Sequence, residues 1–144
     1  MYIQSHNLHN CQNGGMLIIN KTRFFRFSRK LGFSIGYDAC DYGLVIPHYG
    51  TIVVCNTYRI GPYATLHTFT CITDTGRRIG KGLFLSTGAK ITGVTKSFPK
   101  GNALFIGMPA VKKADRPDLL SSLKGESKRR VDAIENLKIK MGIE

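Results

Sequence analysis

Acidic residues are scarce in this chain of 144 residues, and their scarcity limits what the protein can bind and catalyse. It has 9 Asp and Glu against 21 Lys and Arg, which gives a formal net charge of +12 at pH 7. Only Asp38, Asp41 and Asp74 precede Lys112, so most of the chain offers few carboxylates as a general base. The charge favours an anionic partner such as nucleic acid, a membrane surface or a phosphorylated cofactor.

Several other features are missing. No apolar run approaches the roughly 20 residues that a membrane-spanning helix needs, and the N-terminus lacks the pattern of a signal peptide. We therefore expect a cytoplasmic protein of one domain. The four cysteines form neither a C-x-x-C pair nor a zinc-like spacing with histidine, which predicts reduced thiols and no metal.

A six-residue rhythm runs through the middle of the chain. Aliphatic residues recur at this interval, and the interval resumes after a one-residue slip within 73–78; they are Val54, Ile60, Leu66, Ile72, Ile79, Leu85 and Ile91. A period of six fits neither a helix nor a simple hairpin. It is typical of a parallel β-helix with three short sides, each contributing one inward residue, with small residues at the corners. Three sides make one turn, which predicts that Val54 lies over Ile72.

Residues 1–33 are expected to form an N-terminal arm and an amphipathic helix. Within 16–31, five basic residues alternate with Phe24, Phe25 and Phe27, and there is no acid. One interpretation is a helix that touches anionic lipid or nucleic acid. The other is a helix that packs its aromatic rings on the body and leaves its charges in water. The close spacing of the aromatic residues favours the second.

From Ala114 onward the pattern is that of a second helix. Apolar residues recur at intervals of three and four, with charged residues between them: Leu119, Leu120, Leu123, Val131, Ile134, Leu137 and Met141. We expect residues 34–113 to form the β-helix and 114–144 to form a helical tail. The tail would cap the open end of the solenoid or mediate self-association, because strand edges are otherwise exposed there; binding of another macromolecule is the alternative.

The segment GLVIPHYGTIVV at 43–54 and the motifs that follow it closely resemble the serine acetyltransferase branch of the hexapeptide acyltransferases. The similarity spans about residues 30–113 and includes GMPA at 107–110, which is similar to the Gly-x-Pro-Ala signature of these enzymes. The resemblance implies an all-β core, a left-handed parallel β-helix of hexapeptide repeats, with an N-terminal helical arm and a C-terminal helix. It also implies a homotrimer that binds acetyl-CoA between subunits and acetylates a hydroxyl group of a small acceptor, serine or a sugar.

The catalytic histidine of the family corresponds to His48. A hydroxyl group is a poor nucleophile at pH 7, and neutral imidazole has a suitable pKa to take its proton. The alternative for His48 is a structural histidine at a corner. His67, beside the inward Leu66 of the next coil, is a second candidate near the acceptor or the thioester, and a packing or surface role stays open for it.

Several residues are candidates for binding acetyl-CoA. Gly88 and Ala89 suit its pantetheine arm because small side chains permit close approach, and the resemblance adds Ala110. Lys96, Lys112 and Lys113 are candidates for its phosphates; as lysines they are also suited to be solvated surface charges.

The sequence departs from the family in ways that motivate an alternative function. Pro47 precedes His48 where the serine enzymes have Asp, and Ser34 stands where a second Asp is expected. The segment after Ile91 lacks most of the coil that the family has at this position. The alternative is therefore a non-catalytic β-helix scaffold or binding protein that has lost CoA binding. Nucleic-acid binding rests on net charge alone, because no standard motif supports it, and we expect none. Peripheral membrane contact stays open.

Overall fold

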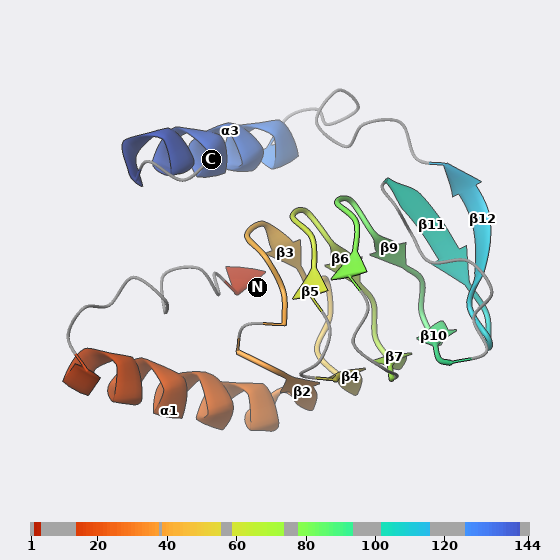
Figure 1. The fold of residues 1–144 in the computed structure, drawn as a ribbon, viewed down its shortest axis with the longest axis horizontal. Coiled ribbons are helices and arrows are strands. Elements are labelled where there is room, and N and C mark those ends of the chain that lie inside the picture. Colours follow the sequence, from red (N-terminus) through yellow and green to blue (C-terminus); the bar gives the residue numbers. More distant parts are fainter. Residues whose placement is uncertain are drawn as a thin grey trace.

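The computed structural model describes residues 2–3, 14–37, 39–55, 59–73, 78–93, 102–115 and 126–141. Helix α1 (Gly14–Lys30) comes before a series of short strands, and helix α3 (Glu126–Met141) follows them. The strands wind into a β-solenoid of about three turns, with α1 at its first coil (Figure 1). The predicted β-solenoid between two helices is confirmed.

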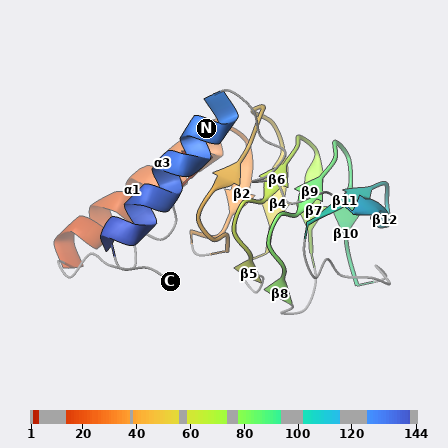
Figure 2. The ribbon, with the colours of Figure 1, turned by 90° about the horizontal axis from the view of Figure 1, so that it is seen from above.

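The solenoid has three sides, and each side is one sheet. The four-strand side consists of β2 (Phe33–Ile35), β4 (Ile52–Val54), β7 (Thr70–Ile72) and β10 (Lys90–Ile91). The two-strand side consists of β5 (Arg59–Ile60) and β8 (Arg78–Ile79). The six-strand side consists of β1 (Tyr2–Ile3), β3 (Leu44–Val45), β6 (Thr65–Leu66), β9 (Phe84–Leu85), β11 (Ala103–Ile106) and β12 (Val111–Asp115). In Figure 2 the coils follow one another from α1 toward β12, with β5 and β8 apart from the other two sides.

Inward side chains of successive coils stack in parallel register. Val54 pairs with Ile72, as the period of six predicts. Ile35 precedes them in the stack and Ile91 follows, and all four are at most 4% exposed. The other two sides repeat this arrangement with the pairs Ile60–Ile79 and Leu66–Leu85. Burial of each such side chain contributes roughly 1.5–3 kcal/mol, so these stacks hold the coils together.

Small residues allow neighbouring coils to approach closely, as the repeat predicts. Gly61 follows Ile60 on the two-strand side, directly under Gly80 of the next coil. A Cβ atom on Gly61 would lie 2.9 Å from the carbonyl carbon of Gly80. No side chain fits at that distance, so glycine is required there by contact between two backbones.

An antiparallel strand forms each edge of the six-strand side and pairs with the outermost parallel strand. β1 pairs with β3, and β12 pairs with β11. Such pairing satisfies backbone groups that would otherwise be open at a strand edge. The first pairing shows that part of the expected N-terminal arm, Tyr2 and Ile3, is a strand; residues 4–13 lie outside the described residues.

The two helices meet the solenoid at different places. α1 packs against β2 at the first coil. α3 contacts a turn of the second coil, where the hydroxyl group of Tyr63 donates a hydrogen bond to the carboxylate of Glu135. In the described part of the chain, β12 rather than α3 therefore closes the edge of β11. Neither described helix is long and apolar enough to cross a membrane.

Candidate active site

The corner that joins the six-strand side to the four-strand side is longer in the first coil than in the second. Val45 of the first coil pairs with Thr65 of the second, and Ile52 pairs with Thr70. Six residues, 46–51, lie between the first member of each pair, whereas four residues, 66–69, lie between the second members. The two additional residues need space outside the prism, because its interior is filled by the stacks. His48 and Tyr49 lie on this longer corner, and both are exposed.

Two imidazole rings from neighbouring coils lie together on this corner. The ring centroids of His48 and His67 are 6.2 Å apart, and the rings are tilted by 54°. His67 also lies against Phe84 of the following coil, with ring centroids 4.9 Å apart. Phe84 thus covers part of the His67 ring, while the His48 ring is open to solvent.

The backbone holds His67 firmly in this position. Its N–H donates a hydrogen bond to the carbonyl oxygen of Leu85 at 3.1 Å. Its carbonyl oxygen accepts one from the hydroxyl group of Thr70 at 2.8 Å, and Thr70 is buried. The solenoid therefore presents this imidazole from a fixed backbone, as a preorganised site requires.

The electrostatic surroundings keep His67 neutral. Burial lowers its pKa below the ordinary value, and the neighbouring His48 lowers it further. Both effects disfavour the charged form, because a cation loses solvation and is repelled by a second cation. No carboxylate contributes to this pKa, and the residue before His48 is Pro47. At neutral pH the pair therefore includes a ring that can accept a proton.

Exposed apolar side chains follow the same edge of the solenoid. Tyr49 and Phe69 lie on the turns after β3 and β6, and Met108 lies on the turn between β11 and β12; their side chains are 81%, 63% and 70% exposed. Phe69 has a φ of 59°, a left-handed conformation that costs a non-glycine residue roughly 1–2 kcal/mol. We call these three residues the apolar row. This row was not predicted from the sequence. Phe69 was a visible signal, because the repeat predicts a small residue at its position.

The small residues assigned to acetyl-CoA divide into two groups. Gly88 lies on the corner next to Phe69, where its N–H donates to the carbonyl oxygen of Thr68 at 3.1 Å and a Cβ would meet nothing within 4 Å. Ala89 and Ala110 are buried in the core at 0% and 3% exposure. Of these predicted residues, only Gly88 therefore borders open space.

The lysines lie at the far end of the six-strand side. Lys112 and Lys113 are on β12 and exposed, but the Nζ atom of Lys112 is 2.5 Å from a carboxylate oxygen of Asp115. Four strand spacings separate β12 from β3, which is roughly 19 Å. A ligand that reacts at His48 would have to span that distance. Lys96 lies outside the described residues.

Among the described residues, no group of three or more His, Cys, Asp or Glu side chains could hold a metal ion. Comparison with models of protein families, with curated proteins and with solved structures gave no match. The similarity to hexapeptide acyltransferases therefore rests on the motifs of the sequence, and the structure adds a β-solenoid that carries two adjacent histidines.

Proposed function

We propose that this chain is an acetyl-CoA-dependent O-acetyltransferase, similar to serine acetyltransferases, on a left-handed β-helix of hexapeptide repeats. One observation carries the proposal. His48, the residue that the resemblance assigns to catalysis, lies on a protruding corner, and its ring centroid is 6.2 Å from that of His67. A purely structural histidine would be expected to be buried and hydrogen-bonded, whereas His48 is exposed.

His48 acts as the general base in this mechanism. Its neutral imidazole accepts the proton of the acceptor hydroxyl while the hydroxyl oxygen attacks the acetyl carbonyl. The new C–O bond forms, the C–S bond breaks, and the proton passes from the imidazolium to the leaving thiolate. His67, which is kept neutral by burial and by its neighbour, is placed to accept a hydrogen bond from the acceptor and to hold it in line.

The apolar row supports the homotrimer in this proposal. Exposed side chains as large as Tyr49, Phe69 and Met108 are better covered than solvated, and Tyr49 and Phe69 lie on the same turns as the two histidines. A neighbouring subunit seated there would exclude water from the reacting groups. The site is then completed only in the oligomer.

Residues along the six-strand side support an anionic cosubstrate, and those near His48 support an uncharged acceptor. The open space at Gly88 and the exposed Lys113 are compatible with acetyl-CoA along the six-strand side. Ala89 and Ala110 would shape its wall from the core. Pro47 and Ser34 offer no carboxylate for the ammonium group of an amino acid, so a sugar hydroxyl is favoured over serine.

A thiol-release assay with acetyl-CoA and a panel of serine and sugar acceptors tests the proposal. His48→Asn keeps a polar side chain of similar size but removes the base, and we expect kcat to fall about 10²- to 10⁴-fold. Thr51→Ala, an exposed change on the same corner, is the matched control and should retain full turnover. Unchanged turnover in His48→Asn contradicts the mechanism.

A non-catalytic scaffold is the second candidate, favoured by the lack of any carboxylate contribution at His67 and by the ion pair of Lys112. Titration calorimetry with CoA separates the two. Saturable binding supports the enzyme. Absence of heat at millimolar CoA supports the scaffold.

A further inference from the structure

The part of the α1 surface that does not pack on the solenoid exposes large apolar side chains to water. Ile18, Ile19, Phe25 and Phe27 are between 44% and 67% exposed. The helix is held to the solenoid by another face, on which Ser28 is buried and Phe24 is partly buried. The expectation that the aromatic residues of this helix pack on the body therefore holds for only part of the set. Single exposed apolar residues are common, but four on one helix indicate an interaction surface.

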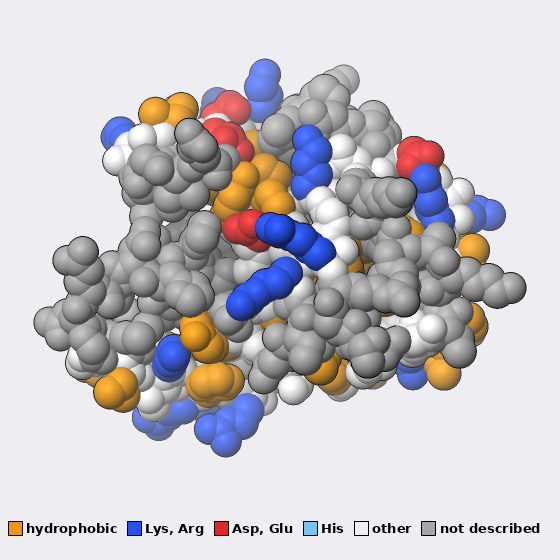
Figure 3. Space-filling view, in the orientation of Figure 1, with side chains coloured by type: hydrophobic (Ala, Val, Ile, Leu, Met, Phe, Trp, Pro, Cys, Tyr) orange, Lys and Arg blue, Asp and Glu red, His pale blue; other side chains and the backbone are white. Residues whose placement is uncertain are grey.

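The same face is strongly basic. Arg23, Arg26, Arg29 and Lys30 are all exposed, and no acidic residue occurs between 14 and 30. Lys21 is different, because its ammonium group lies 4.2 Å from the ring centre of Tyr37 and is thus held against the body. Figure 3 shows hydrophobic and basic side chains intermixed along the lower edge of the molecule, over α1. We call this mixed surface the α1 face.

We propose that the α1 face docks on a membrane surface that contains anionic lipids. Exposed isoleucine and phenylalanine side chains gain free energy when they enter the boundary between headgroups and acyl chains. Arginine and lysine stems can lie along that boundary while their charged ends reach lipid phosphates. Each basic residue near an anionic leaflet adds to the attraction. A helix that lies in the interface satisfies both kinds of side chain at once.

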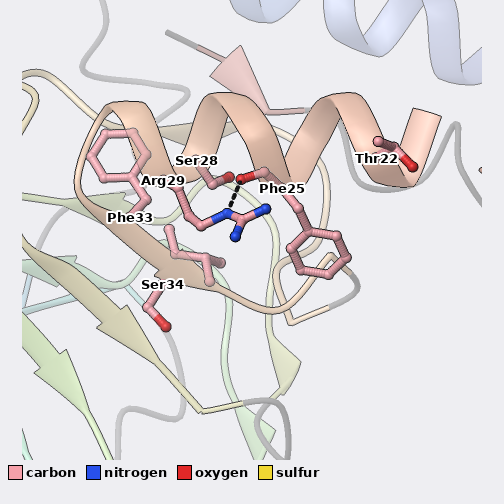
Figure 4. Close-up of a pocket in the computed structure, with 7 residues that line it drawn as sticks. Thr22, Phe25, Ser28, Arg29, Phe33 and Ser34 are labelled. Atoms are coloured by element: carbon pink, nitrogen blue, oxygen red, sulfur yellow. Dashed lines mark hydrogen bonds between the residues drawn. The ribbon is translucent and has the colours of Figure 1, made fainter. Parts of the chain in front are cut away.

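A groove beside the α1 face supplies room for a headgroup. It has a volume of about 570 Å³ and lies between α1 and β2 (Figure 4). Phe25 and Arg29 line it together with the hydroxyl-bearing Thr22, Ser28 and Ser34. Of the described residues, Phe33 and Ile35 also line the groove, and none of those that line it is a carboxylate. A phosphate there would meet the cation of Arg29 and hydroxyl donors.

The apolar members of the face decide between lipid and nucleic acid. Nucleic-acid backbones are bound by Arg and Lys, and such contacts would explain Arg23 and Arg26. They would leave Ile18 and Ile19 in water. A lipid surface would contact both the two arginines and the two isoleucines. It is therefore the partner that the observations favour.

Flotation of the full-length protein with vesicles tests this proposal independently of any catalytic activity. We expect binding to vesicles of phosphatidylcholine and phosphatidylglycerol in equal parts, and weak binding to phosphatidylcholine alone. Binding should decrease as salt is raised, because exposed charges are screened. Equal binding to both kinds of vesicle, or to neither, overturns the proposal.

Two double variants divide the contributions of charge and apolar contact. Arg23→Glu with Arg26→Glu should lower the affinity for anionic vesicles at least tenfold. Ile18→Ser with Ile19→Ser should lower it by a similar factor and leave the net charge unchanged. Arg78→Glu with Lys81→Glu makes the same charge change at exposed positions on and after β8, and should retain most of the affinity.

Further measurements keep the result interpretable. Circular dichroism melting should show that all three double variants remain folded. If the control variant Arg78→Glu with Lys81→Glu loses as much affinity for anionic vesicles as the α1 variants do, the proposal is overturned, because net charge alone would then explain binding. Retention on DNA without vesicle binding overturns it in favour of nucleic acid. Sedimentation that shows the α1 variants dissociating an oligomer, without vesicle binding by the parent protein, assigns the face to a second copy of the chain.

Discussion

Leu31, which directly follows α1, accepts a hydrogen bond from the N–H of Gly50 at 3.0 Å. Gly50 lies two residues after His48 on the protruding corner. A second bond runs from the N–H of Ile52 to the carbonyl oxygen of Gly32, at 3.2 Å. The end of the proposed lipid-binding helix and the corner of the proposed base are therefore joined by two backbone bonds. Docking of α1 would place that corner beside the membrane.

The titration of His67 offers a first prediction. Its imidazole should titrate below the ordinary value of 6.5 in an NMR pH series, because burial and His48 both lower its pKa. Burial is the larger cause, so Phe84→Ala should raise this pKa more than His48→Asn does. The reverse order would contradict the assigned causes.

The same shift has a consequence for folding. An unfolded chain binds a proton at this residue near pH 6.5, whereas the folded chain does so only at lower pH. Stability from His67 is therefore present above pH 6.5 and is lost as pH falls from 6.5 through the lower pKa of the folded state. Urea unfolding across this range should show a smaller decrease for His67→Gln than for the parent protein. An identical decrease would assign the effect to other groups.

The close approach of Gly61 and Gly80 gives a prediction about stability. Gly61→Ala places a Cβ atom 2.9 Å from the backbone of the next coil, so we expect unfolding free energy to fall by about 1–3 kcal/mol. Gly88→Ala is the comparison, because its Cβ has open space and only its φ of 74° is unfavourable. Urea denaturation of both variants measures the difference. A smaller loss in Gly61→Ala than in Gly88→Ala would show that the coils can separate at no cost.

The bond between Tyr63 and Glu135 predicts how α3 is held. Burial, and then the neighbouring carboxylate, raises the pKa of the Tyr63 hydroxyl. Tyr63→Phe removes the donor and should cost about 1.5–3 kcal/mol of the free energy that holds α3 to the solenoid. Amide hydrogen exchange in 126–141 should become faster in this variant. Tyr42→Phe changes the neighbouring ring, 5.4 Å from that of Tyr63, and should leave exchange in α3 nearly unchanged; equal exchange in both variants argues against the role of the bond.

Cys40 should resist alkylation in the folded protein. Burial, with a smaller effect of Asp41, raises the pKa of its thiol to about 12, and the thiolate is the reactive form. Cys55 and Cys71 are partly exposed and should react with iodoacetamide first, as peptide mass mapping will show. Equally rapid modification of Cys40 in the native protein would contradict its burial.

Cys40 also predicts the response to alkaline pH. The unfolded thiol ionises near pH 9, whereas the folded thiol remains protonated to about 12. Stability from this group is present below pH 9 and is lost as pH rises toward 12. Cys40→Ala should show a shallower alkaline decrease in unfolding free energy than the parent protein. A decrease of equal slope would show that other groups cause it.

The stacks were predictable because they depend on a local rule. One inward aliphatic residue every six positions is enough to place Val54 over Ile72. The length of each corner was not predictable in the same way. The rhythm could be read only from Val54 onward, so the two additional residues of 46–51 became visible only when strand pairing fixed both ends of that corner.

The candidate site shows the same division. Its motif indicated His48 and His67, and the structure shows that their rings are neighbours. Ala89 was predicted from its small size and Ala110 from the resemblance, but neither signal tells whether a side chain faces a ligand or the core, and both side chains are buried. Met108 lies far from Tyr49 and Phe69 in sequence, so the apolar row had no continuous signal.

The sequence by itself determined the solenoid, the helix before it and the residues on which its proposed chemistry depends, because periodicity and residue type act over a few neighbouring positions. Only the tertiary structure decided which of those residues meet water. Whether Phe27 points outward, or whether His48 stands clear of the prism, depends on how distant coils and helices pack. That packing is set by contacts between residues a full turn apart, which no local pattern records.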